Sequence, residues 1–351
     1  MVDVHIIGQG LAGSVAALEL LRAGQTIHVS NDPSLSHCSR TAAGLFNPLN
    51  FKTLSRTWNA DVVFPVAMQF YKDSELQLKA SFWHPLPMLR IIGSEGEQKE
   101  WKAALSGNHF APFLNNDPVP EEMSAYNRGF GLGLVEHCGY LDTNTFLEAV
   151  TAMLNDKNIY SEYTCKQEPE KTNQGWNING IESRRVLYCE GWKAMENPLF
   201  NWLPFFPVKG DVILIEDENL KLDHLINAGC FVLPLGNKFY RIGSTYYPDE
   251  TDDVPTQKGR EELLQKAEKV LKRPINISNQ WAGVRPSTGD RRPFIGEHPG
   301  KKGIWIFNGL GSRGVILSPW VARQLSSSMI FGTPIPRETD IVRHLKRFRK
   351  V

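Results

Sequence analysis

Arg285 and Arg313 are the two side chains of this sequence best suited to hold a small anion. Arg285 lies in Gly283-Val284-Arg285-Pro286, and Arg313 lies in Gly311-Ser312-Arg313-Gly314. A guanidinium presents a planar fork of N–H donors, which pairs with a carboxylate through two parallel hydrogen bonds. The small and rigid neighbours of Arg285 predict a loop that aims its side chain. We therefore predict that both arginines are catalytic, with a structural ion pair as the alternative for each.

A glycine-rich turn near the start of the chain predicts a dinucleotide site. Val4–Ile7 is typical of a short buried strand, and Gly8-Gln9-Gly10-Leu11-Ala12-Gly13 follows it and opens a helix. The first glycine allows a tight turn, the second lets a pyrophosphate approach the backbone, and the third lets the helix pack on the strand. A second strand ends at Asn31 and Asp32, either of which could bind the ribose.

A second strand–glycine–helix junction favours a flavin over a nicotinamide. The apolar run Ile304–Asn308 leads through Gly309–Gly314 into a predicted helix over Val315–Met329. The positive end of a helix dipole can stabilise negative charge that develops on a flavin ring during reduction. A nicotinamide gains no such charge, so the junction indicates flavin chemistry.

Composition and charge exclude several other classes of protein. The chain has 351 residues, which predicts two domains, and its 39 basic and 38 acidic residues leave a net charge of +1. This balance gives no general attraction to nucleic acid or to a membrane surface. We expect no membrane span, no targeting peptide before residue 4 and a cytoplasmic location. The five cysteines and nine histidines are scattered, which predicts reduced thiols and no metal site.

The remaining patterns predict an α/β fold in which one domain interrupts another. Gly139–Asp142 leads into an amphipathic helix with Asp142 or Thr143 as its N-cap, and Arg185–Trp192 is typical of a parallel strand. Pro207–Tyr247 is rich in strand patterns. We predict a Rossmann-type nucleotide-binding domain interleaved with a mixed-sheet α+β substrate domain. The first comprises residues 1–59, 140–205 and 281–351, and the second comprises residues 60–139 and 206–280.

Several motifs in one order resemble the FAD-dependent D-amino-acid oxidase and glycine oxidase superfamily, over nearly the whole chain. The matching segments are Gly8–Gly13, Thr41–Leu45, Gly139–Asp142, Pro207–Gly210, Val232–Pro234, Gly243–Thr245, Gly283–Pro286 and Gly311–Gly314. The resemblance implies a D-amino-acid oxidase-like fold and an FAD cofactor. Some relatives attach the flavin to a cysteine in their C-terminal third, but none lies beyond Cys230 here, so we expect non-covalent FAD.

The resemblance also implies which residues contact the cofactor. Gly8, Gly10, Leu11, Ala12 and Gly13 would hold the pyrophosphate, and Asn31 or Asp32 the ribose. Thr41, Ala42, Ala43, Gly44 and Leu45 would lie along the flavin, near Gly191 and Trp192. Gly311, Ser312, Arg313, Gly314 and Val315 would surround its pyrimidine end.

The resemblance places a substrate carboxylate at Arg285. Phe46, Phe231 and Tyr246 would complete the substrate site, although core packing is the alternative for Phe46. Glycine oxidases carry a tyrosine where this chain has Phe231. Tyr240, Tyr246 or Tyr247 could compensate for its hydroxyl, or the substrate could be larger than glycine.

The segments Asn308–Gly314 and Gly332–Pro336 also resemble the oxidase half of the bacterial bifunctional enzymes that make 5-methylaminomethyl-2-thiouridine in tRNA. That half removes a carboxymethyl group from a wobble uridine, so its substrate is chemically an N-substituted glycine. The 351 residues include no methyltransferase half.

Three functions therefore stay open. The first is oxidation of the C–N bond of an amino acid or N-substituted glycine, in which hydride passes to the flavin and the imine is hydrolysed. The second is a stand-alone tRNA wobble-uridine oxidase. The third is a flavin-binding protein without turnover. The basic run Arg343–Lys350 is expected to be a solvated helix rather than an RNA-binding one.

Overall fold

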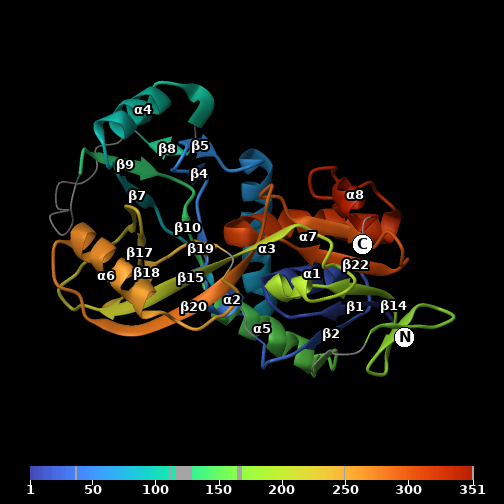
Figure 1. The fold of residues 1–351 in the computed structure, drawn as a ribbon. Coiled ribbons are helices and arrows are strands. Elements are labelled where there is room, and N and C mark those ends of the chain that lie inside the picture. Colours follow the sequence, from blue (N-terminus) through green and yellow to red (C-terminus); the bar gives the residue numbers. More distant parts are fainter. Residues whose placement is uncertain (36–37, 111–112, 116–128, 164–167, 249, 350–351) are drawn as a thin grey trace.

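The computed structural model contains two large sheets that lie side by side. It describes residues 1–351 except 36–37, 111–112, 116–128, 164–167, 249 and 350–351. In Figure 1 the sheet around the N-terminus lies at the right, and the second sheet lies at the left below α4 (Glu95–Leu105) and beside α6 (Gln257–Leu271). None of the described helices combines the length and apolar character that are needed to span a bilayer.

The first sheet is built around parallel strands, as the Rossmann-type prediction requires. Its strands, in spatial order, are β11 (Tyr160–Glu162), β2 (Ile27–Asn31), β1 (Val2–Ile7), β14 (Ile181–Tyr188), β13 (Trp176–Ile178) and β12 (Glu170–Lys171). The end of β14 also pairs in parallel with β22 (Ile304–Asn308), which pairs with β21 (Phe294–Glu297). Helices α1 (Leu11–Arg22), α5 (Thr143–Asp156) and α7 (Gly314–Phe331) accompany this sheet. The predicted dinucleotide-binding fold is therefore confirmed.

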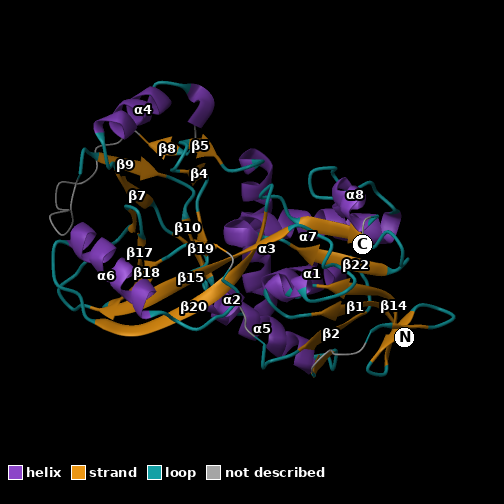
Figure 2. Cartoon of the chain, viewed as in Figure 1, coloured by secondary structure: helices purple, strands orange, loops and turns teal. Residues whose placement is uncertain are grey.

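The second sheet is mixed, as predicted for the substrate side, and it has nine strands. Its main path is β19 (Tyr247–Pro248), β15 (Phe205–Glu216), β18 (Phe239–Gly243), β17 (Phe231–Gly236), β16 (Leu225–Asn227), β7 (Met88–Ile91), β9 (Leu132–Val135) and β8 (Leu114–Asn115). The ninth strand, β20 (Ile277–Thr288), pairs with the other side of β15, from Phe205 to Ile215. These two strands form the long ribbon pair that crosses the lower half of Figure 2.

The expected loop at Arg285 is wrong, because Arg285 lies within β20. It stands opposite Val208 in the antiparallel register with β15. Pro286 does not break this pairing, since β20 is an edge strand and a missing N–H there costs no ladder hydrogen bond.

One long helix, α3, and several short elements complete the fold. They are α2 (Cys38–Thr41), β3 (Leu45–Phe46), β4 (Leu49–Asn50), β5 (Ser55–Arg56), α3 (Ala60–Leu78), β6 (Trp83–Pro85), β10 (Gly139–Leu141), α8 (Leu345–Phe348) and the 3-10 turns η1 (Asn108–Phe110), η2 (Gly191–Met195), η3 (Gly311–Arg313) and η4 (Ile341–His344). Strand β10 lies between β3 and β6 in a small third sheet.

The predicted helix signals act locally as expected. Asp142 is the N-cap of α5, and its carboxylate accepts a hydrogen bond from the backbone N of Thr145 at 3.2 Å. Gly24 follows α1 with φ +75°, which is the left-handed stop that a glycine favours.

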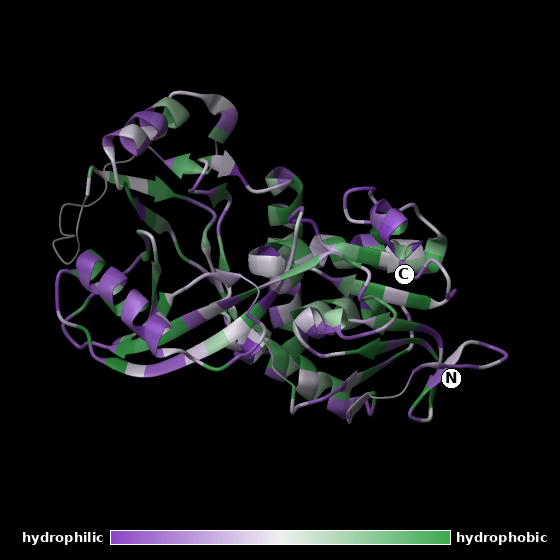
Figure 3. Ribbon diagram, viewed as in Figure 1, coloured by the Kyte–Doolittle hydropathy of each residue, from purple (hydrophilic) through white to green (hydrophobic). Residues whose placement is uncertain are grey.

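Figure 3 shows the apolar residues concentrated in the strands and helices of the nucleotide-binding side, whereas α6 is largely hydrophilic.

The basic C-terminal run is only partly the solvated helix that the sequence predicts. Lys346, Arg347 and Arg349 are exposed. Arg343, however, donates from Nε to the Asp290 carboxylate at 2.9 Å and keeps only 11% of its side chain exposed. Phe348 packs its ring edge against the ring of Trp202. This segment is thus attached to the nucleotide-binding sheet through a buried cation and an aromatic ring.

Candidate active site

A cavity of about 720 Å³ is lined by both sheets and contains most of the predicted site. Every predicted cofactor residue except Gly13 lines it. These residues are Gly8, Gly10, Leu11, Ala12, Asn31, Asp32, Thr41, Ala42, Ala43, Gly44, Leu45, Gly191, Trp192, Gly311, Ser312, Arg313, Gly314 and Val315. These residues thus lie together around one cavity, and their contact with the cofactor stays a prediction.

The glycine turn after β1 has no room for a side chain at its first and last glycines, Gly8 and Gly13. Gly8 has φ +100°, and a Cβ on it would overlap the Cys189 carbonyl. A Cβ on Gly13 would overlap the carbonyl oxygen of Gly8. Gly13 thus shapes the turn from behind instead of lining the cavity. Gly10, at the N-terminal end of α1, lines the cavity with its backbone, which suits a pyrophosphate.

The two candidates for the ribose both lie at the end of β2. Asn31 Oδ1 accepts a hydrogen bond from the backbone N of Gln9 at 2.9 Å, so Asn31 also fixes the glycine turn. Asp32 Oδ1 accepts hydrogen bonds from the backbone N and the hydroxyl of Ser34. Both residues line the cavity, and the choice between them stays a prediction.

Glu190 is a cavity residue that the sequence analysis missed. It follows β14 beside the glycine turn, where burial raises the pKa of its carboxyl from 4.5 to about 7. The Asn197 amide donates to its Oε2 at 2.8 Å and Glu196 adds like charge. An acidic residue directly after a buried strand and before a glycine is the signal that could have found it.

We expect the stability of the FAD-free protein to depend on Glu190 and on pH. The folded state holds this proton up to about pH 7, whereas the unfolded chain releases it near pH 4.5. Stability therefore falls as pH rises between these values and stays lowered above them. Glu190→Gln should leave Tm unchanged near pH 4.5 and raise it by a few degrees at pH 8. Differential scanning calorimetry measures this, with Glu182→Gln as control, because Glu182 is exposed on β14 and lies outside the cavity lining. An equal shift at both pH values would contradict the pKa.

Arg285 is a buried cation that lacks an anion among the described residues. Its guanidinium lies over Gly210, where a Cβ would overlap it. Nη2 donates to the Ser244 hydroxyl at 2.6 Å, while the buried Nη1 has no hydrogen-bond partner. The groups that raise its pKa against burial are Cys38 and Tyr246, and no described carboxylate pairs with it. Since an unpaired buried charge is costly, this nitrogen indicates a site for a carboxylate.

Arg313 is placed differently from the prediction that it is catalytic. It lines the cavity, but its guanidinium is engaged by the chain itself. It donates to the Asn47 carbonyl at 2.8 Å, to Asn47 Oδ1 at 3.1 Å and to the Leu49 carbonyl at 2.8 Å. Arg313 therefore braces the segment that follows the predicted flavin-lining residues. Two of these three acceptors are backbone carbonyls, which residue types alone do not reveal.

The three predicted aromatic substrate residues separate in the structure. Phe231 lines the cavity and lies over Gly243, where a Cβ would contact its ring. Phe46 is 3% exposed, does not line the cavity and stacks on Trp83 with ring centroids 4.1 Å apart. Its position matches the core-packing alternative. Tyr246 is 63% exposed and lies outside the cavity lining.

No metal or disulfide is evident in the part of the chain that the structure describes. No group of three or more His, Cys, Asp or Glu residues is placed to hold a metal there. The four described cysteines are free thiols, and Cys165 lies outside the described residues.

A Rossmann-type sheet with a glycine turn, joined to a mixed sheet that carries an unpaired arginine, defines a dinucleotide-dependent oxidoreductase. The chain belongs to the FAD dependent oxidoreductase (DAO) family, whose model matches residues 3–328. FAD is therefore its cofactor, and the glycine cradle and the cavity fit that molecule.

Relatives within this family bear two kinds of name. Glycine oxidase of Pseudomonas aeruginosa is 25% identical over 95% of this chain and 96% of its own length. Glycine oxidase of Bacillus licheniformis is 32% identical over 42% of this chain, a segment that spans 40% of that enzyme. The tRNA 5-methylaminomethyl-2-thiouridine biosynthesis bifunctional protein MnmC of Idiomarina loihiensis is 24% identical over 98% of this chain, but the match spans only 58% of MnmC.

Solved structures share the fold at low identity. Glycine oxidase of Bacillus cereus matches with a TM-score of 0.78 and 19% identity over 95% of this chain and 96% of that one. Iminodiacetate oxidase of Chelativorans sp. BNC1 matches with a TM-score of 0.79 and 17% identity over 96% of this chain and 99% of that one. These likenesses confirm the predicted D-amino-acid oxidase-like fold.

Proposed function

We propose that this protein oxidises the C–N bond of an N-substituted glycine or another amino acid. The observation that carries the proposal is the buried, unpartnered Nη1 of Arg285 on the cavity wall. A carboxylate is the anion that matches a guanidinium fork. A substrate clamped there would hold its α-carbon in one fixed position, and such positioning can lower a barrier by roughly 7–11 kcal/mol at best.

The side chains of the cavity wall near Arg285 favour binding of the substrate amine in its neutral form. The lining residues from the nine-stranded sheet and the segment after it are Met88, Gly210, Val212, Asn227, Phe231, Ser244, Gly283, Arg285 and Pro286. None of them is a carboxylate or a histidine, so no side-chain base faces the substrate there. The amine would therefore bind without its extra proton.

The reaction balances with these parts. Bound FAD supplies the acceptor for a hydride from the α-carbon. The substrate nitrogen loses its proton to solvent as the C=N bond forms. Water then adds to that imine and releases an amine and glyoxylate, or the corresponding keto acid. Arg285 holds the carboxylate throughout, and we propose that Gly8–Ala12 and Gly311–Val315 hold FAD without a covalent bond.

Anaerobic bleaching of the bound flavin tests the proposed function. The FAD-loaded protein would meet glycine and sarcosine separately, and tRNA that carries carboxymethylaminomethyl-uridine in a third sample. Bleaching by any of them supports the proposal. A flavin that no amine reduces would instead favour the third alternative, a flavin-binding protein without turnover.

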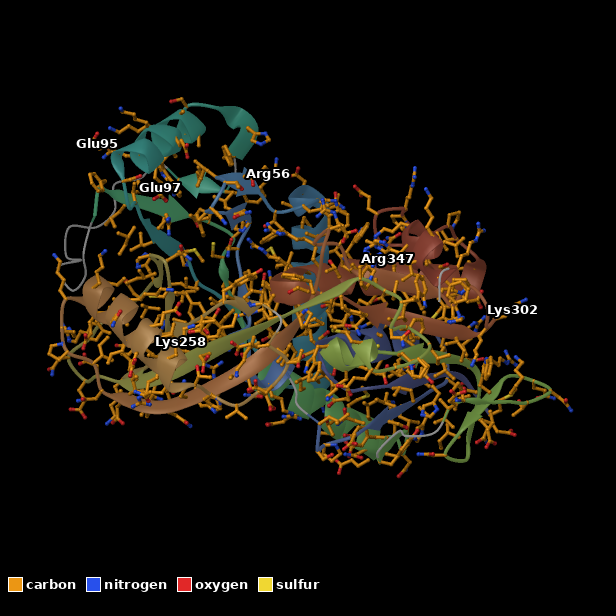
Figure 4. The ribbon with its side chains drawn as sticks, in the orientation of Figure 1. Arg56, Glu95, Glu97, Lys258, Lys302 and Arg347 are labelled. Atoms are coloured by element: carbon orange, nitrogen blue, oxygen red, sulfur yellow. The ribbon has the colours of Figure 1, made fainter. Side chains whose placement is uncertain are left out.

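A tRNA substrate is the second candidate, favoured by the MnmC relative that matches 98% of this chain. The exposed basic residues of the C-terminal segment, among them Arg347 in Figure 4, offer phosphate contacts. Deleting this segment is a poor test, because Arg343 and Phe348 anchor it to the nucleotide-binding sheet.

Charge reversal tests the tRNA candidate without removing those anchors. We expect the combined variant Lys346→Glu, Arg347→Glu and Arg349→Glu to slow bleaching by tRNA about tenfold at low salt, because each lost cation weakens phosphate binding. Bleaching by sarcosine should not change. Three exposed lysines elsewhere, changed as Lys72→Glu, Lys99→Glu and Lys102→Glu, provide the control. Equal rates with tRNA in all three proteins would argue against this surface.

A further inference from the structure

One row of residues crosses the nine-stranded sheet and forms part of the cavity wall. The strand register places Arg90, Asn227, Phe231 and Gly243 beside one another on β7, β16, β17 and β18. Directly opposed residues on paired strands point to the same face of a sheet. Asn227 and Phe231 both line the cavity, so this face is the one that a substrate meets.

The side-chain amide of Asn227 has a fixed orientation. Arg90 donates from Nη1 to Asn227 Oδ1 at 2.6 Å and from Nε to Glu97 Oε1 at 2.7 Å. A guanidinium has donors only, so the amide oxygen must face it and the NH₂ end is left for the cavity. The Arg90 and Glu97 side chains are only 14% and 19% exposed, and Glu97, labelled in Figure 4, comes from α4. Arg90, itself held by Glu97, therefore fixes the direction in which Asn227 presents its two N–H donors.

These donors lie at some distance from Arg285. The strands run in the order β20, β15, β18, β17 and β16. With a spacing of about 4.8 Å between neighbours, β20 and β16 are about 19 Å apart across the sheet. Trp281 is the residue of β20 that is level with Val212 and Gly243, and Arg285 lies further along the same strand, opposite Val208. The apolar side chains of Val212 and Phe231 line the cavity between them. A glycine whose carboxylate is bound at Arg285 has no atom that could reach Asn227.

We propose that Asn227 is a specificity-determining residue that recognises the substituent on the substrate nitrogen. Its NH₂ group donates to a carbonyl or carboxylate oxygen on that substituent, while Arg285 holds the glycine carboxylate. The substrate class is thus a glycine whose nitrogen carries a group with hydrogen-bond acceptors. Arg90 and Glu97 are positioning residues for Asn227. The inference rests on the proposed function, because it extends the same site.

Binding of two ethers to the FAD-loaded protein tests the inference without turnover. Methoxyacetate and (carbamoylmethoxy)acetate replace the amine nitrogen by oxygen, so they cannot form an imine, and only the second carries an acceptor beyond the ether. Their Kd values are measured from the perturbation of the flavin absorbance. We expect the second to bind about tenfold more tightly to the unaltered protein, which corresponds to about 1.4 kcal/mol.

Asn227→Asp keeps an oxygen for Arg90 and removes both donors, so it should abolish this preference. If Asn227→Asp does not fold, Asn227→Ala tests the same point, because alanine also lacks both donors and should abolish the preference. Gln77→Glu is the matched control, because Gln77 also accepts a hydrogen bond from an arginine, Arg22, but lies outside the cavity lining.

An unchanged preference in both Asn227 variants would overturn the inference, and so would an equal loss of affinity for both ethers. Failure of the proposed function looks different. In that case neither ether binds to the unaltered protein, and no N-substituted glycine bleaches its flavin.

Discussion

Replacing Arg285 by alanine should raise KM for an amino-acid substrate by about 100-fold or more, while the protein keeps its FAD. Arg285 offers the substrate a buried guanidinium with an unpartnered Nη1. Truncating one partner of a buried, charged hydrogen-bonded pair costs about 2–5 kcal/mol. Steady-state kinetics and the ratio of flavin to protein absorbance provide the two readings.

Two further variants separate the role of this charge from general damage. Gly210→Ala leaves Arg285 in the sequence but places a Cβ where its guanidinium lies, so it should raise KM in the same direction. Arg292→Ala removes an arginine that packs over the ring of Trp58 outside the cavity lining, and its KM should not change. An unchanged KM in Arg285→Ala would remove this residue from the carboxylate site.

Gly13→Ala should give a protein that no longer retains FAD. The added Cβ would overlap the backbone oxygen of Gly8, which cannot move aside as a flexible side chain could. Overpacking of this kind costs about 3 kcal/mol or more and displaces α1 from the glycine turn. We therefore expect the FAD content after purification to fall at least about tenfold.

Gly289→Ala is the control for that experiment, because a Cβ there meets nothing within 4 Å. It should keep its FAD and its Tm. If Gly13→Ala retained FAD as well as the control does, then close packing between this turn and its helix would not be what holds the cofactor site in shape.

The features that the sequence predicts well are local ones. The strand, turn and helix at Gly8–Gly13 and the cap at Asp142 depend on neighbours within a few residues. The resemblance to a known family added the segments, such as Thr41–Leu45 and Gly311–Val315, that meet around one cavity.

The features that the sequence missed depend on long-range register. Arg90 reaches Asn227 across 137 positions of sequence, and Arg313 reaches Asn47 across 266. Residue spacing in the sequence cannot reveal either pair. The first contact forms only when β7 pairs with β16, and the second forms only when η3 packs close to β3. The prediction of a loop at Arg285 fails for a related reason. Pro286, next to Arg285, is typical of a strand only at the edge of a sheet. The sequence does not show that β20 lies at such an edge.

The interleaved order of the strands also has a consequence for biosynthesis. In the nucleotide-binding sheet, β1 pairs with β14, and β14 in turn pairs with β22, which ends at Asn308. The sheet that begins with β1 is therefore complete only after translation has passed residue 308. Such non-local pairing slows folding and leaves nascent strands exposed to misassembly. Stalled chains that stop before β22 should consequently fail to capture FAD, whereas released chains of 351 residues should succeed.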